Sequence, residues 1–553
     1  MISKSQFSVL FVLTSLVYLA GMFVTLFEND SAQFAVMAMR MVQEGDFLSL
    51  FKGPEEYLDK PHMHYWLAAI SFKIFGLHEW AYRIPGILAT FLAAYSCFGL
   101  GKLLYSREVG RLSALVFMTA QTIVLAAIDV RTDAVLTGFA ALAIWQLATF
   151  LEKNELKNLL VGAVAMGLAF STKGQIAVLV IGLPLLCHTI YRNKWAVLWS
   201  WKLLVAIIVF AITISPVLYA YYLQFDLHPE KVIRGRDHRS GILFILWEQS
   251  FERLSGEGIG KNSSDYFFFF HTFLWVFLPW TIIGLLAYIT RLRKGIKMQF
   301  KRVDGYEVLT LGGITLIFFI ISFAQFKLPH YLNITIPLFA VLTASYIYEL
   351  AISGEIRLRK WLLGFQYFIL VLVIICCSLL LGFVFPLSTG WSYLVYLLIG
   401  IIGIIYIFRN KDFLNRMVFI SAGSALILNA VLNTHFYPSL LTYQAGSEMA
   451  KVIAENDVSV DEIYKISERY SWALDFYNQK PVKIVSILDL KGDEDYWVYA
   501  TEEDLDELKK AGLYWDDSFE VKQFRITRLQ AKFLNPGSRQ KILNQMYLVH
   551  LKK

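Results

Sequence analysis

Acidic and basic residues recur near the ends of long apolar runs, where a charge is costly and therefore indicates a function. Asp30 follows the first run, Asp133 lies between the third and fourth runs, and Lys173 lies between the fifth and sixth. A carboxylate can take a proton from an attacking hydroxyl, and cations can stabilise the charge that grows on a leaving phosphate. These residue types predict transfer of a sugar from a lipid phosphate, at a pocket that faces the membrane.

The full set contains several acids and cations, and the predicted topology puts all of them on the same side of the membrane. Its members are Glu28, Asp30, Asp59, Lys60, Asp129, Arg131, Asp133, Lys173, Lys327, His330 and Tyr331. Their convergence is a stronger indication of a site than any one of them, because an isolated charge has many structural explanations.

Each of these residues also has a plainer interpretation. Asp30 could cap a helix that starts near Ser31, since aspartate is a favoured capping residue. Lys173 and Lys327 could be lysines whose stems are buried while their ammonium groups reach the interface. Two further groups could be purely structural: an ion pair within a tight turn (Asp129, Arg131 and Asp133) and histidines that pack or lie on the surface rather than bind metal (His62 and His64).

The elements that must position these side chains are membrane-spanning helices. The chain of 553 residues is 57% hydrophobic and 17% charged, and a run of about 20 apolar residues spans a bilayer. We predict about thirteen spans, at 7–27, 82–104, 112–128, 132–151, 158–172, 175–191, 203–223, 267–290, 307–324, 331–350, 361–385, 391–408 and 416–435. The first run has no clear cleavage site and is interpreted as a retained helix.

Positive charges in the short loops predict the orientation of the chain. Alternate loops are rich in Lys and Arg, as in 102–111, 153–157, 192–194 and 291–297, whereas the intervening short loops hold almost none. With the N-terminus in the cytoplasm, every basic loop also lies in the cytoplasm. An odd number of spans then puts the C-terminal segment outside, in the periplasm if the membrane is a bacterial inner membrane.

Three segments on the outer side are too long to be simple connections. Two are loops, 28–81 and 224–266, in which we expect short amphipathic helices. The third is 440–553, where short β-rich runs alternate with helical patterns such as Glu503–Lys510; the runs are Glu462–Ile466, Val482–Ile487, Tyr496–Ala500 and Phe519–Ile526. We therefore predict an all-α polytopic membrane domain, residues 1–439, followed by a small soluble α/β domain, residues 440–553.

Composition argues against several other classes of protein. The formal charge of +7 comes mainly from short loops, and no soluble segment carries a basic stripe with interleaved aromatics, so we expect no nucleic-acid partner. The four cysteines, Cys97, Cys187, Cys376 and Cys377, all lie in apolar runs without a metal-ligand spacing. We expect them to be small hydrophobic groups rather than a disulfide framework or a zinc site.

Several short motifs, in order across residues 20–340, resemble those of the C-type membrane glycosyltransferases. The likeness is to the bacterial branch with lipid A aminoarabinose transferase, which is related to the protein O-mannosyltransferases. The motifs are Asn29-Asp30 with Phe34-Ala35, Gly45-Asp46, Asp59-Lys60-Pro61, Tyr65-Trp66, Arg131-Thr132-Asp133, Thr172-Lys173-Gly174, Leu278-Pro279-Trp280 and Lys327-Leu-Pro-His-Tyr331. Each motif is weak alone, but their order and spacing make the resemblance specific.

The resemblance implies roles for individual residues. Asp30 matches the catalytic aspartate of the first loop, and Asp133 matches a second acidic position near the donor pocket. Lys60 matches a lysine that binds the donor phosphate, with Asp59 beside it, and Arg253 lies in a loop like the one that supplies a phosphate-binding arginine. We expect Lys173 and Lys327 to bind the same phosphate. The substrate pocket is then expected to include Glu28, Asp59, Asp129, Arg131, His330 and Tyr331.

The chain departs from the family pattern in the first loop. Family members often have Asp-Glu, whereas Asp30 is followed by Ser31, and Glu28 precedes it. Glu28 could supply the second carboxylate, or none is needed. A divalent metal therefore stays open as a cofactor, and no other cofactor is expected.

The expected function is transfer of a glycosyl group from a polyprenyl-phosphate sugar to an acceptor on the periplasmic face of the inner membrane. Lipid A, a protein hydroxyl and another glycan or glycolipid are all compatible acceptors, and the donor sugar is not specified by the sequence. We expect a monomer. The alternative is a transporter or lipid flippase, but transporters place charges near the bilayer midplane and often show repeated halves. Here the charges gather at one interface.

Overall fold

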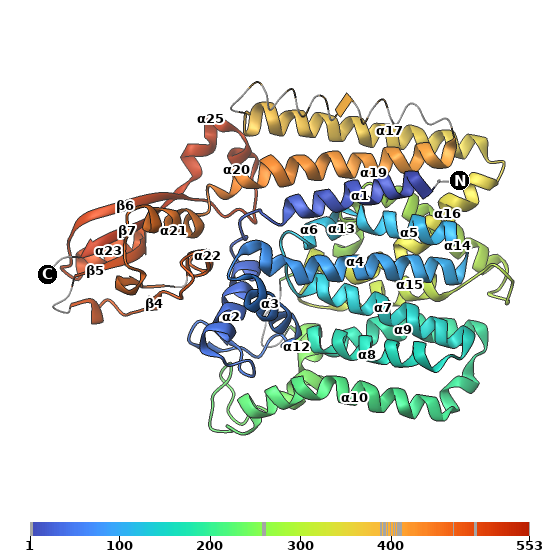
Figure 1. Ribbon diagram of the computed structural model, residues 1–553, viewed down its shortest axis with the longest axis horizontal. Helices are drawn as coiled ribbons and strands as arrows, with labels where there is room; N and C mark the ends of the chain where they lie inside the picture. Colours follow the sequence, from blue (N-terminus) through green and yellow to red (C-terminus); the bar gives the residue numbers. More distant parts are fainter. Residues whose placement is uncertain are drawn as a thin grey trace.

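The computed structural model describes residues 4–256, 262–387, 412–467, 469–491 and 495–551, together with single residues between 390 and 405. Most of the described chain forms a bundle of roughly parallel and antiparallel helices, and a smaller domain with a β-sheet projects from one end (Figure 1). The predicted class, a helical membrane protein with a C-terminal α/β domain, is confirmed.

Within the described residues, eight helices are long and apolar enough to cross a membrane. Several consist of one α-helix, and others include a short 3-10 or π-helical segment. They are Lys4–Gly21 (α1), Glu79–Leu104 (α4), Thr132–Lys153 (α7), Gln175–Arg192 (α9), Trp201–Asp226 (α10 and its extension), Pro329–Ile352 (with α16, Ile336–Ile352), Ile356–Val384 (with α17, Ile356–Leu379) and Phe413–Leu441 (α19, Phe413–Val431, and α20, Tyr437–Leu441).

Other predicted spans coincide with shorter, broken or less apolar helices. These are Arg107–Met118 (α5), Gln121–Ala126 (α6), Leu156–Lys173 (α8), Phe268–Val276 (α13), Thr281–Lys297 (α14) and Leu309–Phe323 (α15). The run predicted at 391–408 lies largely outside the described residues. The count of about thirteen spans therefore stays a prediction.

Small residues allow the helices near the site to pack closely. A Cβ atom added at Gly138 of α7 would lie 2.6 Å from the carbonyl oxygen of Ala89 in α4, so the two backbones are nearly in contact. Such close approach is a common way for helices to associate in a membrane, where water does not drive apolar groups together. It fixes α7, whose first turn carries Asp133, against α4.

The two outer loops fold over one end of the bundle. The first contains Asp30–Glu44 (α2), the two-residue strands Phe51–Lys52 (β1) and Glu55–Glu56 (β2), and Met63–Phe75 (α3). The second contains Gly241–Leu243 (α11) and Gln249–Ser255 (α12). Figure 1 shows α2 and α3 between the bundle and the C-terminal domain. The expected outer helices are therefore present, at the end of the bundle to which the domain is attached.

The C-terminal domain is built on a five-stranded mixed sheet in the order β4-β3-β5-β7-β6. β3 pairs in parallel with both β4 and β5, and β7 pairs antiparallel with β5 and β6. The strands are Ile463–Lys465 (β3), Lys483–Ile484 (β4), Tyr496–Thr501 (β5), Trp515–Gln523 (β6) and Asn544–Leu551 (β7). The helices are Ala445–Glu455 (α21), Trp472–Tyr477 (α22), Glu502–Lys510 (α23), Ala531–Leu534 (α24) and Pro536–Arg539 (α25).

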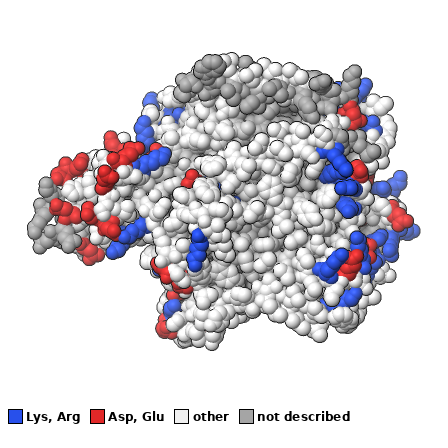
Figure 2. Space-filling view, in the orientation of Figure 1, with Lys and Arg blue, Asp and Glu red and all other residues white. Residues whose placement is uncertain are grey.

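Surface charge is concentrated at the two ends of the molecule. Figure 2 shows Lys and Arg gathered at the end of the bundle opposite the C-terminal domain, with a few acidic residues among them. A broad belt of uncharged residues separates this end from the charged surface of the domain. Such a belt is what a lipid bilayer requires of the surface that it covers.

His62 and His64 are buried and hydrogen-bonded within the protein. Burial lowers the pKa of both His62 and His64 to about 4, so both imidazoles are neutral near pH 7. Their Nε2 atoms lie 2.9 Å from the Leu48 carbonyl oxygen and from the Tyr82 hydroxyl, respectively. All four cysteines are free thiols.

Candidate functional site

Two acidic residues from separate elements begin helices at the end of the bundle to which the C-terminal domain is attached. Asp30 is the first residue of α2, and Asp133 lies in the first turn of α7. The partial positive charge of a helix N-terminus favours an ionised carboxylate at such a position. The two side chains differ greatly in exposure, since that of Asp30 is 43% exposed and that of Asp133 is 4% exposed.

Arg131 links two of the predicted acids. One of its guanidinium nitrogens lies 3.0 Å from Asp30 Oδ2, and another lies 2.9 Å from Asp129 Oδ2. Its own side chain is 19% exposed, so the charges are only partly screened by water. The expected ion pair within the tight turn is present, but it extends to Asp30 and joins the 129–133 turn to the start of α2.

A second cluster surrounds Asp133. The Lys173 ammonium lies 2.6 Å from Asp133 Oδ1, and His330 Nε2 lies 3.6 Å from Asp133 Oδ2. The same ammonium lies 4.7 Å from the centre of the Tyr331 ring, which is close enough for a cation–π contact. Residues from three separate segments are thus brought together at the outer ends of α7 and α8.

The charges of the two clusters are close enough to act on one another. The charges of Asp30, Arg131 and Lys173 all act on the His330 imidazole, and Arg131 also acts on Asp133. The structure therefore brings together Asp30, Asp129, Arg131, Asp133, Lys173, His330 and Tyr331, as the sequence predicted.

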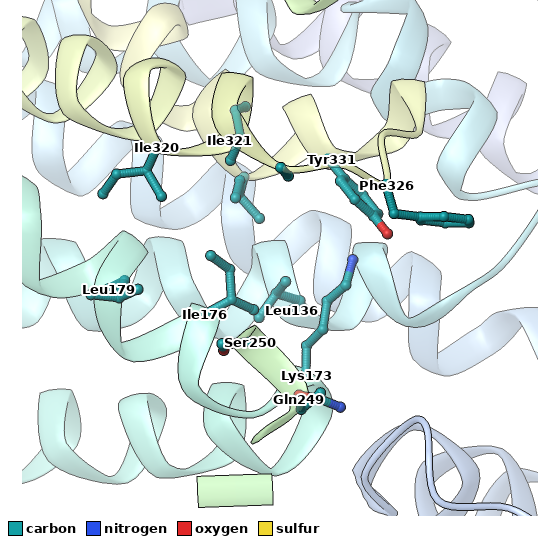
Figure 3. Close-up of a pocket in the computed structure, with 12 residues that line it drawn as sticks. Leu136, Lys173, Ile176, Leu179, Gln249, Ser250, Ile320, Ile321, Phe326 and Tyr331 are labelled. Carbon is teal, nitrogen blue, oxygen red and sulfur yellow. The ribbon is translucent and has the colours of Figure 1, made fainter. Parts of the chain in front are cut away.

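An apolar groove of about 100 Å³ starts at Lys173 and runs between the helices. Its aliphatic wall is formed by Leu136, Ile176, Leu179, Ile320, Ile321 and Ile334. In Figure 3 the Lys173 side chain lies beside Tyr331 and Phe326, while Leu179 and Ile320 lie away from the ammonium group. The groove therefore has a cationic end and a hydrocarbon-like body.

Gly174 fixes the direction in which the chain leaves Lys173. It has a φ of 71°, and a Cβ atom there would lie 2.4 Å from Gln249 Oε1. Glycine tolerates both the positive φ and the close approach. The Gln249 amide in turn donates a hydrogen bond of 2.7 Å to the Asp59 carbonyl oxygen. Gly174 thus allows the second outer loop to pack beside Lys173 and to contact the first.

The predicted donor-binding residues of the two outer loops lie in and around a chain of ion pairs. Asp59 pairs with Arg234, whose other nitrogen lies 3.2 Å from Glu252 Oε2, and Glu252 also pairs with Arg239. Lys60 follows Asp59 and is half-buried. Arg253 belongs to α12, but its side chain lies outside the described part of the structure.

Lys327 is held by residues of the second outer loop. Its backbone exchanges two hydrogen bonds of 2.7 Å with the Asn262 side chain, and its ammonium lies 3.4 Å from the Ser263 carbonyl oxygen. The residue is 2% exposed. It is adjacent to Phe326, which lines the groove, but the structure shows no direct contact between Lys327 and the Asp133 cluster among the described residues.

Glu28 occupies a different position from the one expected. Its carboxylate accepts hydrogen bonds of 2.9 and 3.0 Å from the backbone N–H groups of Trp472 and Ala473, at the start of α22. Burial raises the pKa of this carboxyl to about 7. Glu28 therefore joins the first outer loop to the C-terminal domain, instead of lying beside Asp30 as a second carboxylate of the pocket.

Two buried polar residues hold the elements around the site in place, although neither belongs to a motif identified in the sequence. The Arg83 guanidinium donates to the carbonyl oxygens of Met22, Val24 and Ile128, so it ties the end of α1 to the turn before Asp129. Gln249 bridges the two outer loops, as described above. The signal for Arg83 was available, because a charge inside the apolar run 82–104 is exceptional.

The described residues contain no group of three or more His, Cys, Asp and Glu side chains arranged to hold a metal ion. Asp30 and Asp133 are each paired with a cationic side chain instead.

Known proteins resemble this chain in sequence. The family model described as dolichyl-phosphate-mannose-protein mannosyltransferase matches residues 59–219. An undecaprenyl phosphate-alpha-4-amino-4-deoxy-L-arabinose arabinosyl transferase of Proteus mirabilis is 23% identical over 58% of this chain and 55% of its own length. The corresponding protein of Edwardsiella ictaluri is 24% identical over 66% of this chain and 64% of its own length. The matches thus span less than two thirds of these relatives.

Solved structures resemble the whole chain in fold. The crystal structure of ArnT from Cupriavidus metallidurans bound to undecaprenyl phosphate aligns with a TM-score of 0.74 at 15% identity, and covers 99% of this chain and 98% of that one. The same protein in the apo state aligns with a TM-score of 0.72. The resemblance seen in the motifs is thereby confirmed: this multi-pass membrane protein is similar in sequence to the aminoarabinose transferases and has the fold of ArnT.

Proposed function

We propose that this protein transfers a glycosyl group from a polyprenyl-phosphate sugar to a lipid A-type acceptor at the outer face of the bacterial inner membrane. The observation that supports this most strongly is the apolar groove with Lys173 at one end. An isoprenoid chain needs a hydrocarbon-like channel, and its phosphate needs a cation where that channel meets water. Homologues named for such a donor, and a similar fold bound to undecaprenyl phosphate, agree with this assignment.

The chemistry divides between the two acids. An acceptor hydroxyl attacks the anomeric carbon, the bond from that carbon to the phosphate oxygen breaks, and the phosphate leaves with the electron pair. Asp30 takes the hydroxyl proton, because its partly exposed carboxylate is open to a substrate. Asp133 is buried and acts through Lys173, whose ammonium it holds towards the leaving phosphate. The two predicted catalytic acids thus have different tasks.

The remaining cationic and aromatic residues of the site bind the donor phosphate or position the two acids and Lys173. Lys60, Lys327 and Arg253 add positive charge for the donor phosphate from the two outer loops and from the segment before α16. Arg131 fixes Asp30, with Asp129 as its second partner. Tyr331 holds the Lys173 stem and ammonium in place through its ring, and His330 borders Asp133.

The charge distribution supports an outward-facing site. The basic end of the bundle lies opposite the C-terminal domain (Figure 2), and excess Lys and Arg mark the cytoplasmic side of a membrane protein. The N-terminus is then cytoplasmic, and the site and the C-terminal domain, residues 440–553, are periplasmic. We propose that the protein acts as a monomer.

Purified protein in nanodiscs tests the proposal. Polyprenyl-phosphate sugars are supplied one at a time, with lipid A, a hydroxyl-bearing peptide or no acceptor, and release of the free lipid phosphate is followed. We expect release that depends on lipid A and is lost in Asp30→Asn. Movement of lipid or solute across the membrane, without sugar transfer from any donor, would instead support a transporter or flippase.

A further inference from the structure

A second cavity, here called the outer cleft, lies between α2, the β1–β2 hairpin and the C-terminal domain. Its volume is about 420 Å³, against about 100 Å³ for the apolar groove. Charged and aromatic side chains are prominent in its lining, which includes Arg40, Glu44, Lys465, Trp472, Asp475 and Lys483. None of these residues lines the apolar groove, so the outer cleft is a separate space with a different chemistry.

A buried ion pair forms one wall of the outer cleft. Lys465 Nζ lies 2.7 Å from Asp475 Oδ2 and 3.1 Å from Ser471 Oγ, and both charged side chains are 2% exposed. Removing two charges from water often costs more than their attraction returns, so such a pair is weak evidence for stability alone. Here the pair fixes the shape of the wall, because Asp475 also accepts a hydrogen bond of 2.9 Å from the Val482 N–H group, next to Lys483.

The opposite wall comes from α2. Arg40 pairs with Glu44 at 2.6 Å and donates a hydrogen bond of 3.0 Å to the Gly53 carbonyl oxygen, which holds the β1–β2 hairpin against the helix. Val36 and Met37 line the cleft nearer the start of the helix. With a rise of about 1.5 Å per residue, the lined part of α2 starts about 9 Å from Asp30 and ends about 21 Å from it.

Contacts between the two walls hold the outer cleft open in a fixed shape. Glu28 accepts two backbone hydrogen bonds at the start of α22, the helix that carries Trp472 and Asp475. Gln444 donates to the Leu26 carbonyl oxygen and accepts from the Glu28 N–H, and the Tyr477 hydroxyl accepts from the Leu26 N–H. A pre-formed cavity loses less entropy on binding than one that must be assembled.

We propose that the outer cleft binds a sugar ring of the acceptor, at a distance from the hydroxyl that reacts at Asp30. The accessible charged groups of the cleft, Arg40, Glu44 and Lys483, offer donors and acceptors together, which suits the hydroxyl groups of a sugar better than an anion or a hydrocarbon chain. Trp472, which is buried except for its edge on the cleft, adds an apolar patch to the lining. This inference rests on the proposed transferase function, and it assigns the acceptor to a glycan-bearing lipid rather than a polypeptide.

Charge changes at the mouth of the cleft test this binding site in the full-length protein in nanodiscs. Arg40→Gln and Lys483→Glu are compared with Lys510→Glu, an exposed lysine of the same domain that does not line the cleft. We expect the two cleft variants to raise the KM for lipid A about tenfold, as loss of one charged hydrogen bond would. Their kcat and their affinity for the donor should stay within twofold of wild type, and Lys510→Glu should match wild type throughout.

A photocrosslinking amino acid gives a second readout. It does not depend on turnover, and it does not require that the protein fold normally after a change of charge. Placed at Ile484, which is exposed and lines the cleft, it should capture lipid A, whereas the same group at Tyr514, exposed elsewhere in the domain, should not. Capture of another glycolipid at Ile484 would also support a glycan site. Capture of a peptide acceptor there, or no difference between the two positions, would overturn it.

The two proposals fail in different ways. If wild-type protein releases lipid phosphate from no donor with any acceptor, the proposed transferase function is wrong. If wild type and Lys510→Glu are active and the cleft variants keep a normal KM for lipid A, the transferase stands and the outer cleft is not its acceptor site.

Discussion

Asp133 and Lys173, 40 positions apart in the chain, form a buried ion pair of 2.6 Å at the polar end of the apolar groove. The pair joins the first turn of α7 to the last residue of α8, so it links helix packing to the charge that is available at the groove. Its energetic role and its chemical role can be separated by substitution.

Lys173→Met should leave the Asp133 carboxylate buried without its main partner, which costs about 3–5 kcal/mol of folding free energy. It should also weaken binding of undecaprenyl phosphate. The double variant Lys173→Met/Asp133→Asn should recover most of the stability but none of the affinity. Thermal unfolding and ligand titration on the same preparations measure both quantities. Recovered affinity in the double variant would show that Lys173 does not bind the phosphate.

Asp30→Asn keeps the shape of the side chain and removes the base. We expect kcat to fall by a factor of about 10²–10⁴, with donor affinity within twofold of wild type. Asp129→Asn is the matched control, because Asp129 is the other partner of Arg131. A single-turnover assay with pre-bound donor measures the chemical step directly. Equal losses in the two variants would assign Asp30 to holding Arg131 rather than to proton transfer.

Glu28 should make stability depend on pH. Its folded-state pKa, about 7, lies above the ordinary value of 4.5, so ionisation opposes folding. The stabilising contribution is complete below about pH 4.5 and is lost as the pH rises to about 7, a change of about 3 kcal/mol. Glu28→Gln should remove this slope. Thermal unfolding of both proteins from pH 5 to pH 7.5 tests this, and parallel curves would contradict it.

Gly174→Ala should be destabilising for two separable reasons. The alanine must adopt a φ of 71°, which costs about 1–2 kcal/mol, and its Cβ atom would press on the Gln249 side chain. Gln249→Ala in the same chain should relieve the contact but not the backbone strain. We expect the double variant to lie between Gly174→Ala and Gln249→Ala in unfolding temperature. Full recovery in the double variant would assign the whole effect to the contact.

The parts of the fold that follow from local pattern were predictable from the sequence. Apolar runs predicted the long helices, and the Glu503–Lys510 pattern matches α23 to within one residue. The strand predicted at Val482–Ile487 is shorter in the structure, and the last strand, β7, was missed although it lies in the middle of the sheet's antiparallel half. Strand formation depends on partners that are distant in the sequence, which a local pattern does not reveal.

The sequence predicted which residues meet at the candidate site, but not which side chains pair with one another. Charges at the ends of apolar runs predicted that Asp30, Asp133 and Lys173 would converge, because lipid tolerates them at few other places. Which cation pairs with which acid depends on how helices are rotated and packed, and the sequence holds no local signal for that. Glu28 was misplaced for the same reason, since its partners lie 444 and 445 positions further along the chain.

The contacts that hold residues 26–28 come from Gln444, Tyr477 and the start of α22, all more than 400 positions later in the sequence. During synthesis, the segment that carries Asp30 therefore enters the membrane long before its supports exist. Its final geometry has to wait until the C-terminal domain has been synthesised and has folded. A partly synthesised chain therefore contains Asp30 before the contacts that position it have formed, so the geometry around Asp30 depends on the last part of the chain to be made.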